Sequence, residues 1–220
     1  MMEKGVSGRA GRARLGAVLA MALMWASPLA ATQEYILPTL FNVTGVADDD
    51  VLNIRVRPSA GAEIIGALAP DARGVEVVAH DASGRWAQIN TGERSGWVAL
   101  RYLAYRTDVW EPGAVPAALR CIGTEPFWSL VTADDVAVFS TPDAPDRSMK
   151  LEAVLDTGVF RSPHRALLAR SDARSLVAVI APAACSDGMS DMAYGLEATL
   201  ILQDGEGAGM LTGCCSIAPR

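Results

Sequence analysis

The alternation of hydrophobic and polar residues predicts a chain built mainly from β-strands. The segment LNIRVR at residues 52–57 places Leu52, Ile54 and Val56 on one face and polar side chains on the other, as in a half-buried strand. Further strands are predicted at residues 74–80, 85–90 and 96–103. The turn signals DASG and TGERS separate them, and short strands spaced by such turns favour a small barrel or sandwich.

The second half of the chain repeats the β pattern. Residues 121–142 predict two strands around an Ala-Asp-Asp turn, and residues 175–185 form an apolar run. The segment 194–202 alternates, and the polar turn 203–209 leads into a returning strand at 210–217. The stretch 155–172 is ambiguous and leaves room for one short helix. We therefore expect a second antiparallel β domain, either a barrel or a sandwich.

The N-terminal residues have the layout of a secretory signal peptide. A basic segment with Lys4 and Arg14 precedes the uncharged apolar run 15–25, which is too short for a comfortable membrane span of roughly 20 residues. Small residues follow, and we expect cleavage near Ala31. The alternative is an uncleaved N-terminal anchor. With residues 1–31 as a signal peptide, we expect a periplasmic or secreted protein with no membrane span after cleavage.

Charge narrows the possible partners. Removing residues 1–31 takes away four of the 19 basic and one of the 25 acidic residues, which leaves 15 against 24 and a net charge of −9. So acidic a chain is repelled by phosphate backbones and anionic lipid, which argues against nucleic acid as a partner. No Walker loop or dinucleotide-binding fingerprint occurs, and we expect no cofactor.

The four cysteines, Cys121, Cys185, Cys214 and Cys215, favour disulfides in an exported chain. Adjacent strand residues point to opposite faces, so Cys214 and Cys215 can join two different segments. This favours one bond to Cys121 and one to Cys185. A Cys214–Cys215 ring and a zinc site are the alternatives, but zinc would require CxxC spacing or nearby histidines, so we expect no metal.

The first half resembles the bacterial SH3 (SH3b) domain. The resemblance rests on LNIRVRPSAGAEIIGALAPDARGVEVV, GRWAQI and SGWVALRYL, and VRPS departs from the turn that the family usually has there. The family is non-catalytic, and some members bind peptidoglycan peptides. The resemblance implies a domain at residues 36–105, followed by a linker at 106–117.

By this resemblance, one groove would gather aromatic faces and cationic side chains that suit a peptide carboxylate. The expected ligand-binding residues are Asn53, Arg55, Arg57, Trp86, Trp97 and Tyr102. The structural alternative is that the tryptophans belong to the core and the arginines to a solvated strand face.

The second half, residues 118–220, resembles a family of bacterial envelope proteins with no agreed activity. The motifs CIGTEPFW, CSDGMSD and GCC carry this resemblance, and Tyr194-Gly195 departs from the family's Tyr-Pro. The flanking cysteines predict that the first two motifs lie close together. We therefore take Glu125, Trp128, Asp187 and Asp191 as candidate surface residues, with Phe127 and Trp128 also able to fill a barrel end.

Catalytic arrangements are sparse in this sequence. The only histidines are His80 and His164, and a triad would need His164 beside Asp187 or Asp191 and Ser186 or Ser190. The carboxylates of Glu125, Asp187 and Asp191, with Trp128 to stack on a sugar, would be the candidate residues for glycosidase chemistry. We expect no enzyme, and we predict a non-catalytic envelope protein that binds peptidoglycan or a peptide and possibly another envelope protein. An inhibitor of a secreted enzyme such as lysozyme is the alternative, followed by a wall hydrolase.

Overall fold

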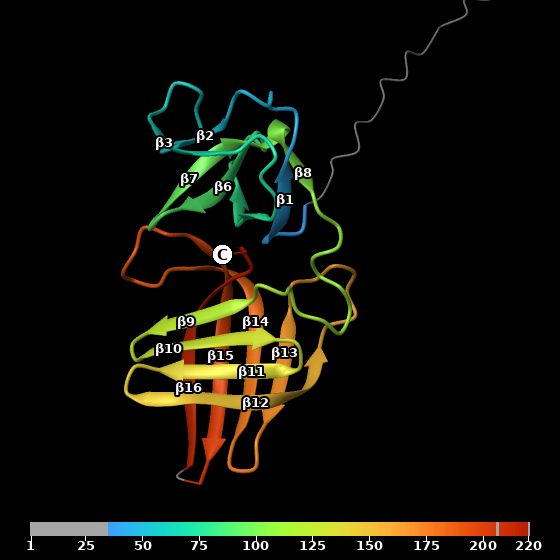
Figure 1. Cartoon of the computed structure of the whole chain (residues 1–220), viewed down its shortest axis with the longest axis vertical. Coiled ribbons are helices and arrows are strands. Elements are labelled where there is room, and N and C mark those ends of the chain that lie inside the picture. Colours follow the sequence, from blue (N-terminus) through green and yellow to red (C-terminus); the bar gives the residue numbers. More distant parts are fainter. Residues whose placement is uncertain (1–34, 206, 220) are drawn as a thin grey trace, which may run out of the picture. The chain divides into compact units, whose positions relative to one another are not determined.

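The computed structural model describes residues 35–205 and 207–219 (Figure 1). The predicted signal peptide, residues 1–31, lies outside the described residues. The regular structure of the described residues is β-strand, apart from one 3-10 helix, η1 (Leu100–Tyr102). Its buried apolar residues form two separate clusters, one in the first half of the sequence and one that lies mainly in the second half but includes Leu40. The predicted mainly β fold is confirmed.

The first cluster lies between two antiparallel sheets. One sheet has the order β4-β1-β8 and the other the order β3-β2-β7-β6-β5. Their strands are β1 (Thr39–Val43), β2 (Leu52–Arg55), β3 (Ile64–Leu68), β4 (Val75–Val77), β5 (Ala79–His80), β6 (Trp86–Thr91), β7 (Arg94–Ala99) and β8 (Leu103–Tyr105). The alternation seen in the sequence puts Ile54, Ile89 and Val98 inside, which leaves the intervening polar residues on the outer face.

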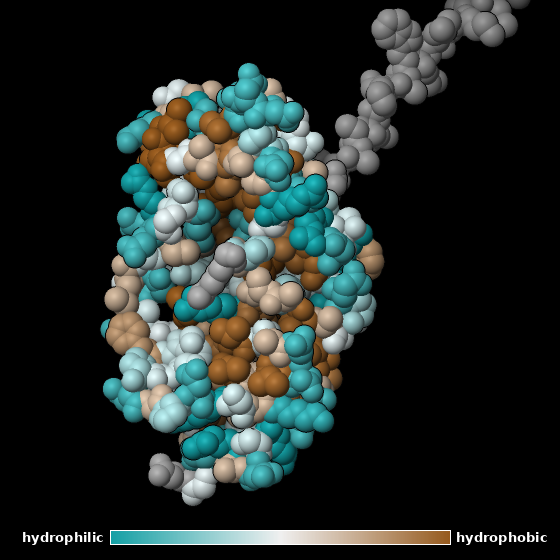
Figure 2. All heavy atoms as spheres, viewed as in Figure 1, coloured by the Kyte–Doolittle hydropathy of each residue, from teal (hydrophilic) through white to brown (hydrophobic). Residues whose placement is uncertain are grey.

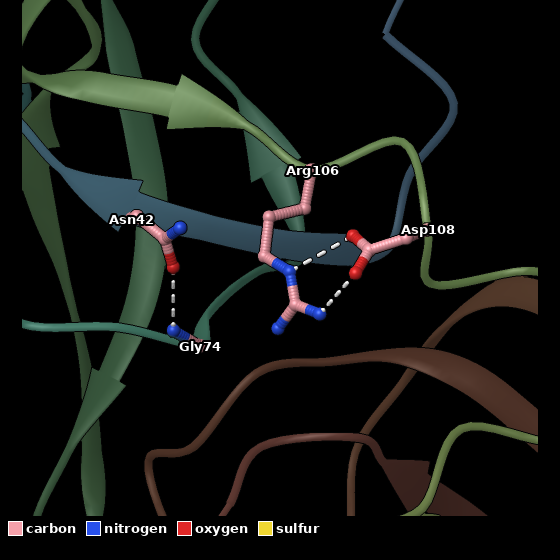
Figure 3. A network of polar contacts seen from close by, with 4 residues as sticks. All are labelled: Asn42, Gly74, Arg106 and Asp108. Atoms are coloured by element: carbon pink, nitrogen blue, oxygen red, sulfur yellow. Dashed lines mark hydrogen bonds and ion pairs between the residues drawn. The ribbon is translucent and has the colours of Figure 1, made fainter.

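Polar contacts fix where this sheet structure begins and ends (Figure 3). Asn42 on β1 accepts a hydrogen bond from the amide of Gly74 at 3.1 Å, just before β4. Arg106, directly after β8, donates to both carboxylate oxygens of Asp108 at 3.0 and 2.7 Å. This two-pronged pair is formed within the segment that leads from β8 to the second half.

The second half forms a closed eight-stranded antiparallel barrel in the order β10-β11-β12-β13-β14-β15-β16-β9. Its strands are β9 (Arg120–Thr124), β10 (Phe127–Ala133), β11 (Val136–Thr141), β12 (Ala144–Leu155), β13 (Arg165–Arg170), β14 (Ser175–Cys185), β15 (Tyr194–Asp204) and β16 (Gly207–Ser216). Inward side chains such as Leu130, Phe139 and Leu200 fill the interior, so the barrel is packed rather than hollow.

Two disulfides confirm the predicted use of the adjacent cysteines. Cys215 faces the interior and is joined to Cys121, its direct partner across the β16–β9 seam. Cys214 points to the other side of β16 and is joined to Cys185 at the end of β14. One bond therefore locks the barrel where its first and last strands meet, and the other tethers the loop that follows β14.

Several predicted elements differ in detail. The short helix considered for residues 155–172 is absent; that stretch is a turn followed by β13, because Leu167 and Ala169 point inward at strand spacing. The single strand expected at 74–80 is divided between β4 and β5, which belong to different sheets. The strand expected at 96–103 is interrupted by η1, since the chain must cross from one sheet to the other.

The segment predicted as a linker, residues 106–117, packs against the barrel cluster and the residues before β1. Trp110 is buried in the barrel cluster, and its indole N–H donates to the carbonyl of Pro38 at 2.8 Å. Leu40 of β1 belongs to the same cluster. A Cβ on Gly195 would lie 2.9 Å from Pro38, which explains why this chain has a glycine after Tyr194.

The surface also carries apolar residues. Figure 2 shows brown, hydrophobic side chains over the region of β2 and β3, where Val56 and Ile64 are exposed. Among the described residues, no helix is both long and apolar enough to cross a membrane.

Candidate functional site

A groove of about 450 Å³ opens on the outer side of the first sheet structure. Asn53 and Arg55 line it from β2, and Trp86 lines it from the start of β6. Ala99 pairs with Trp86 across β6 and β7 and also lines the groove. Tyr102 of η1 completes the aromatic lining. This volume lies in the range of small-ligand and peptide pockets.

The turn before β6 holds Trp86 in place. The carboxylate of Asp81 accepts hydrogen bonds from the amides of Ser83, Arg85 and Trp86 and from the hydroxyl of Ser83. The Ser83 hydroxyl contributes most to stabilising the charged form, and together these bonds lower the pKa of Asp81 to about 2. The predicted DASG turn therefore positions the first aromatic wall of the groove.

The cationic side chains of the groove are partly restrained. Arg55 donates from Nη1 to the carbonyl of Ala62 at 2.6 Å. The guanidinium of Arg101 lies 4.6 Å from the ring centre of Tyr102 and donates to its hydroxyl at 3.2 Å. Asp50 lines the same groove and accepts a bond from the amide of Val51. The groove thus offers both signs of charge beside aromatic faces.

Four of the six predicted ligand-binding residues meet in this groove, namely Asn53, Arg55, Trp86 and Tyr102. Arg57 lies beyond the end of β2 and is exposed, and it does not line the groove. Trp97 also lies outside the lining; it is half-buried between Arg55 and Gln88 in register. Neither tryptophan belongs to the first core cluster.

Sequence reasoning missed Asp50 and Arg101 as groove residues. Arg101 directly precedes Tyr102, but side-chain alternation along a single strand would have placed it on the opposite face. The 3-10 turn breaks that alternation and brings both residues to one side. Asp50 lies in the loop before β2, and no sequence pattern indicated that this loop lines the groove.

In the barrel, Trp128 takes the second of its two predicted roles and fills the barrel end, while it also lines a pocket of about 410 Å³ with Asp187. Its side chain is only 4% exposed and stacks on Phe139 inside the barrel, as expected for a residue that fills a barrel end. Cβ atoms on Gly123 and Gly213 would come within 2.0 and 2.7 Å of its indole, so both motif glycines make room for it. Phe127, predicted to fill the same end, is one position away on β10 and 51% exposed on the outside.

The CIGTEPFW and CSDGMSD loops do lie together, as predicted. The hydroxyl of Thr124 donates to the carbonyl of Asp187 at 2.8 Å. Glu125, which is exposed, and Asp187 line a small pocket of about 220 Å³ beside the outer disulfide. Asp187 therefore lines two pockets, one with Glu125 and one with Trp128, whereas Asp191 lines neither.

Asp187 is occupied by its own loop. Its carboxylate accepts bonds from the amides of Met189 and Ser190 at 3.0 and 2.9 Å, and from the hydroxyls of Ser190 and Tyr194. Burial alone would raise the pKa of Asp187, but these bonds outweigh it and the net shift is downward. This is the turn role that the Asp-Gly sequence predicts.

Asp191 acts through its backbone. Its amide donates to the carbonyl of Glu93 at 3.0 Å, and its carbonyl accepts from the amide of Ser95 at 2.8 Å. Next to it, the side chain of Asn90 makes two hydrogen bonds with the backbone of Ala193. The loop therefore occupies the edge of β7 at the hairpin tip, where β2 no longer pairs with it.

The histidine that could have served a triad has a local partner. The ring Nδ1 of His164 lies 2.9 Å from the hydroxyl of Ser162, two residues before it. Ser190, one of the serines considered beside His164, donates to Asp187. Within residues 35–205 and 207–219, no group of three His, Cys, Asp or Glu side chains is arranged to hold a metal ion.

Comparison with known proteins identifies the groove-bearing half. Residues 50–104 match the family model described as the bacterial SH3 domain, and this range contains most of the groove lining. No match was found among curated proteins or among solved structures. The chain therefore carries a bacterial SH3 domain, which suggests a binding role, beside a disulfide-bonded eight-stranded barrel.

Proposed function

We propose that the protein is a non-catalytic binding protein of the cell envelope, whose SH3 domain recognises peptidoglycan or a peptide. The observation that carries this proposal is the groove of about 450 Å³ in which Asn53, Arg55, Trp86 and Tyr102 converge. These residues come from three separate elements, so the fold and not the local sequence brings them together.

The chemistry of the groove suits a peptide that carries both charges. Trp86 and Tyr102 offer large contact faces with little loss of side-chain entropy. Arg55 and Arg101 can pair with a carboxylate, and Asp50 can pair with an ammonium group. Wall peptides carry both groups. We expect the aromatic faces to supply most of the affinity and the charges to supply orientation.

The rest of the chain supports a location outside the cytoplasm. Both disulfides are formed, and no described cysteine is free. Disulfides persist in oxidising compartments. Together with the signal-like residues 1–31 and the bacterial SH3 domain, this favours a periplasmic or secreted protein.

Co-sedimentation with purified cell-wall sacculi tests the proposal. Wild-type protein is compared with Trp86→Ala, which removes a groove wall, and with Trp97→Ala, which removes a half-buried tryptophan outside the groove. Each variant is first checked for folding by circular dichroism. We expect Trp86→Ala to lose binding by about 10-fold or more and Trp97→Ala to retain it. Absence of wild-type binding, or equal loss in both variants, would contradict the proposal.

A further inference from the structure

A second cavity, of about 490 Å³, lies between the segment after the SH3 domain and the loop before β13. Trp110 and Pro112 line it from one side, and Val159, Phe160 and Arg165 from the other. In Figure 1 these are the green segment that leaves β8 and the golden loop that joins β12 to β13. Gly113 and Asp156 connect the two segments by a hydrogen bond of 2.8 Å.

Arg165 is a buried cation at this cavity, with only 3% of its surface exposed. Its guanidinium donates to the carbonyls of Glu111, Ala114, Ser162 and His164 at 2.6 to 2.9 Å. A guanidinium has five N–H groups, so these four bonds leave one N–H on Nη2. Within the described residues, none of its hydrogen bonds goes to a carboxylate. The site therefore retains one donor and a positive charge.

Asp156 lines the same cavity, and its charge acts on Arg165 without a hydrogen bond between them. Asp156 accepts from the amides of Gly113 and Gly158 at 2.8 and 2.7 Å. These two amides are the main cause of its lowered pKa, and the charge of Arg165 contributes least. The same bonds occupy both amides, so neither is open to pair with a peptide backbone. A ligand here is held by charge and apolar contact rather than by backbone pairing.

The rim of the cavity is apolar and unusually exposed. Val159 and Phe160 are adjacent in sequence, and 67% and 75% of their surfaces are accessible. A contiguous exposed apolar patch beside a cavity is a feature of ligand-binding sites. Arg161 adds a second cation, because its guanidinium lies 4.5 Å from the ring centre of Phe160. Its backbone has φ of 55°, a left-handed conformation that is uncommon for a residue other than glycine.

We propose that this cavity binds a small amphipathic carboxylate of the fatty-acid type, with its head group at Arg165 and Arg161 and its chain against Trp110, Val159 and Phe160. The remaining N–H of Arg165 supplies the buried donor, and Arg161 supplies charge at the mouth. The apolar walls cover the chain. This site is separate from the SH3 groove and does not depend on the proposed wall recognition.

Decanoate is the probe that tests this inference, with 1-decanol as its matched neutral counterpart. Binding is followed by isothermal titration calorimetry and by tryptophan fluorescence, since Trp110 lines the cavity. Arg165 is left intact, because it holds four backbone carbonyls. The variants Arg161→Gln and Phe160→Ala probe the head group and the chain without disturbing buried residues.

The controls separate this cavity from other apolar surface. Ile64→Ser alters the exposed patch over β2 and β3, and Arg170→Gln removes an exposed barrel arginine that lies outside the cavity. We expect decanoate to bind with a Kd on the order of 100 µM or tighter. Arg161→Gln and Phe160→Ala should each weaken binding about 5-fold or more, and both controls should leave it unchanged.

Three outcomes would overturn the inference. The first is no decanoate binding at millimolar concentration. The second is equal binding of 1-decanol, which would show that the guanidinium groups contribute nothing. The third is loss of binding in Ile64→Ser but not in Phe160→Ala, which would place the ligand on the SH3 domain.

Discussion

The SH3 groove and the motif cluster of the barrel contain similar residue types but use them differently. In the groove, Trp86 is anchored through its backbone by Asp81, and its side chain remains partly accessible. In the barrel, Trp128 is enclosed over two glycines, and Asp187 is bonded within its own loop. A tryptophan beside acidic residues therefore indicates ligand recognition only where hydrogen bonds to its backbone hold it in place and its side chain stays accessible.

We expect the largest loss of stability from removing the disulfide that joins β9 and β16 at the barrel seam. Replacing Cys121 and Cys215 by serine removes a cross-link between residues 94 apart, and we expect a loss of about 4–5 kcal/mol in unfolding free energy. Removing the Cys185–Cys214 bond, with a separation of 29, should cost about 3–4 kcal/mol. Urea unfolding without reductant measures both. A larger loss from the second pair would contradict the structural ranking.

The second prediction tests whether Gly123 is required to make room for Trp128. Gly123→Ala places a methyl group 2.0 Å from the indole nitrogen of Trp128, and we expect destabilisation of about 3 kcal/mol. Gly209→Ala is the matched control on β16, because nothing lies within 4 Å of its Cβ position. Thermal unfolding compares the two. Equal melting temperatures would show that Trp128 can move away at little cost and that the cluster is not built around it.

A pH-dependent effect is expected at Glu76. This carboxyl is buried and accepts hydrogen bonds from Ser216 and the amide of Ile217, and burial outweighs these bonds and raises its pKa. With the folded pKa above the ordinary value of 4.5, its contribution to stability is present below that value and is lost as pH rises through the folded pKa. Tyr194 nearby stays neutral, because burial raises its pKa to about 12.

Glu76→Gln removes this titration and keeps an acceptor for Ile217. We expect it to abolish the loss of stability with rising pH and to be more stable than wild type at pH 7, by about 1–3 kcal/mol. Denaturant unfolding between pH 4 and pH 8 measures the slope. Glu197→Gln, an exposed glutamate on β15, should keep the wild-type slope. If Glu76→Gln keeps the wild-type slope, Glu76 is not the cause of the loss of stability with rising pH.

The smallest effect concerns the groove. Asp81→Ala removes the acceptor that fixes Trp86, and we expect binding of soluble wall fragments to weaken about 3- to 10-fold with little change in global unfolding. Because the pKa of Asp81 is lowered from 3.8 to about 2, the stabilisation of this turn by its carboxylate should be complete above pH 3.8. It should be lost as the pH falls towards 2. Fluorescence titration measures the dissociation constant, and unchanged binding would mean that Trp86 needs no such anchor.

Much of the fold could be predicted because strand alternation is strong where one face is buried. The cysteine pairing followed from the same alternation at Cys214 and Cys215. The strands β1, β3 and β12 were not predicted, since none carries a clear alternation: β1 is buried at most positions, and β3 and β12 are largely accessible. Closure of the barrel depends on strand register, which the sequence of one chain does not reveal.

The candidate site was only partly predictable. Asn53 and Arg55 could be placed by alternation on one strand, and Trp86 by the turn that precedes it. The position of Trp97 could not be resolved, because two tryptophans on neighbouring strands can share a face without sharing a groove. The enclosure of Trp128 could not be predicted, because the glycines that surround it lie 90 residues apart in sequence and meet only through the seam between β9 and β16.

An NMR titration of the ¹⁵N-labelled protein with a soluble wall peptide fragment tests most directly whether the SH3 groove is the binding site. We expect the amide and indole signals of Asn53, Trp86, Arg101 and Tyr102 to shift together along one binding curve, while those of Phe127, Asp187 and Met189 do not change. Shifts confined to the barrel motifs, with a silent groove, would contradict this expectation and would move recognition to the other half of the chain.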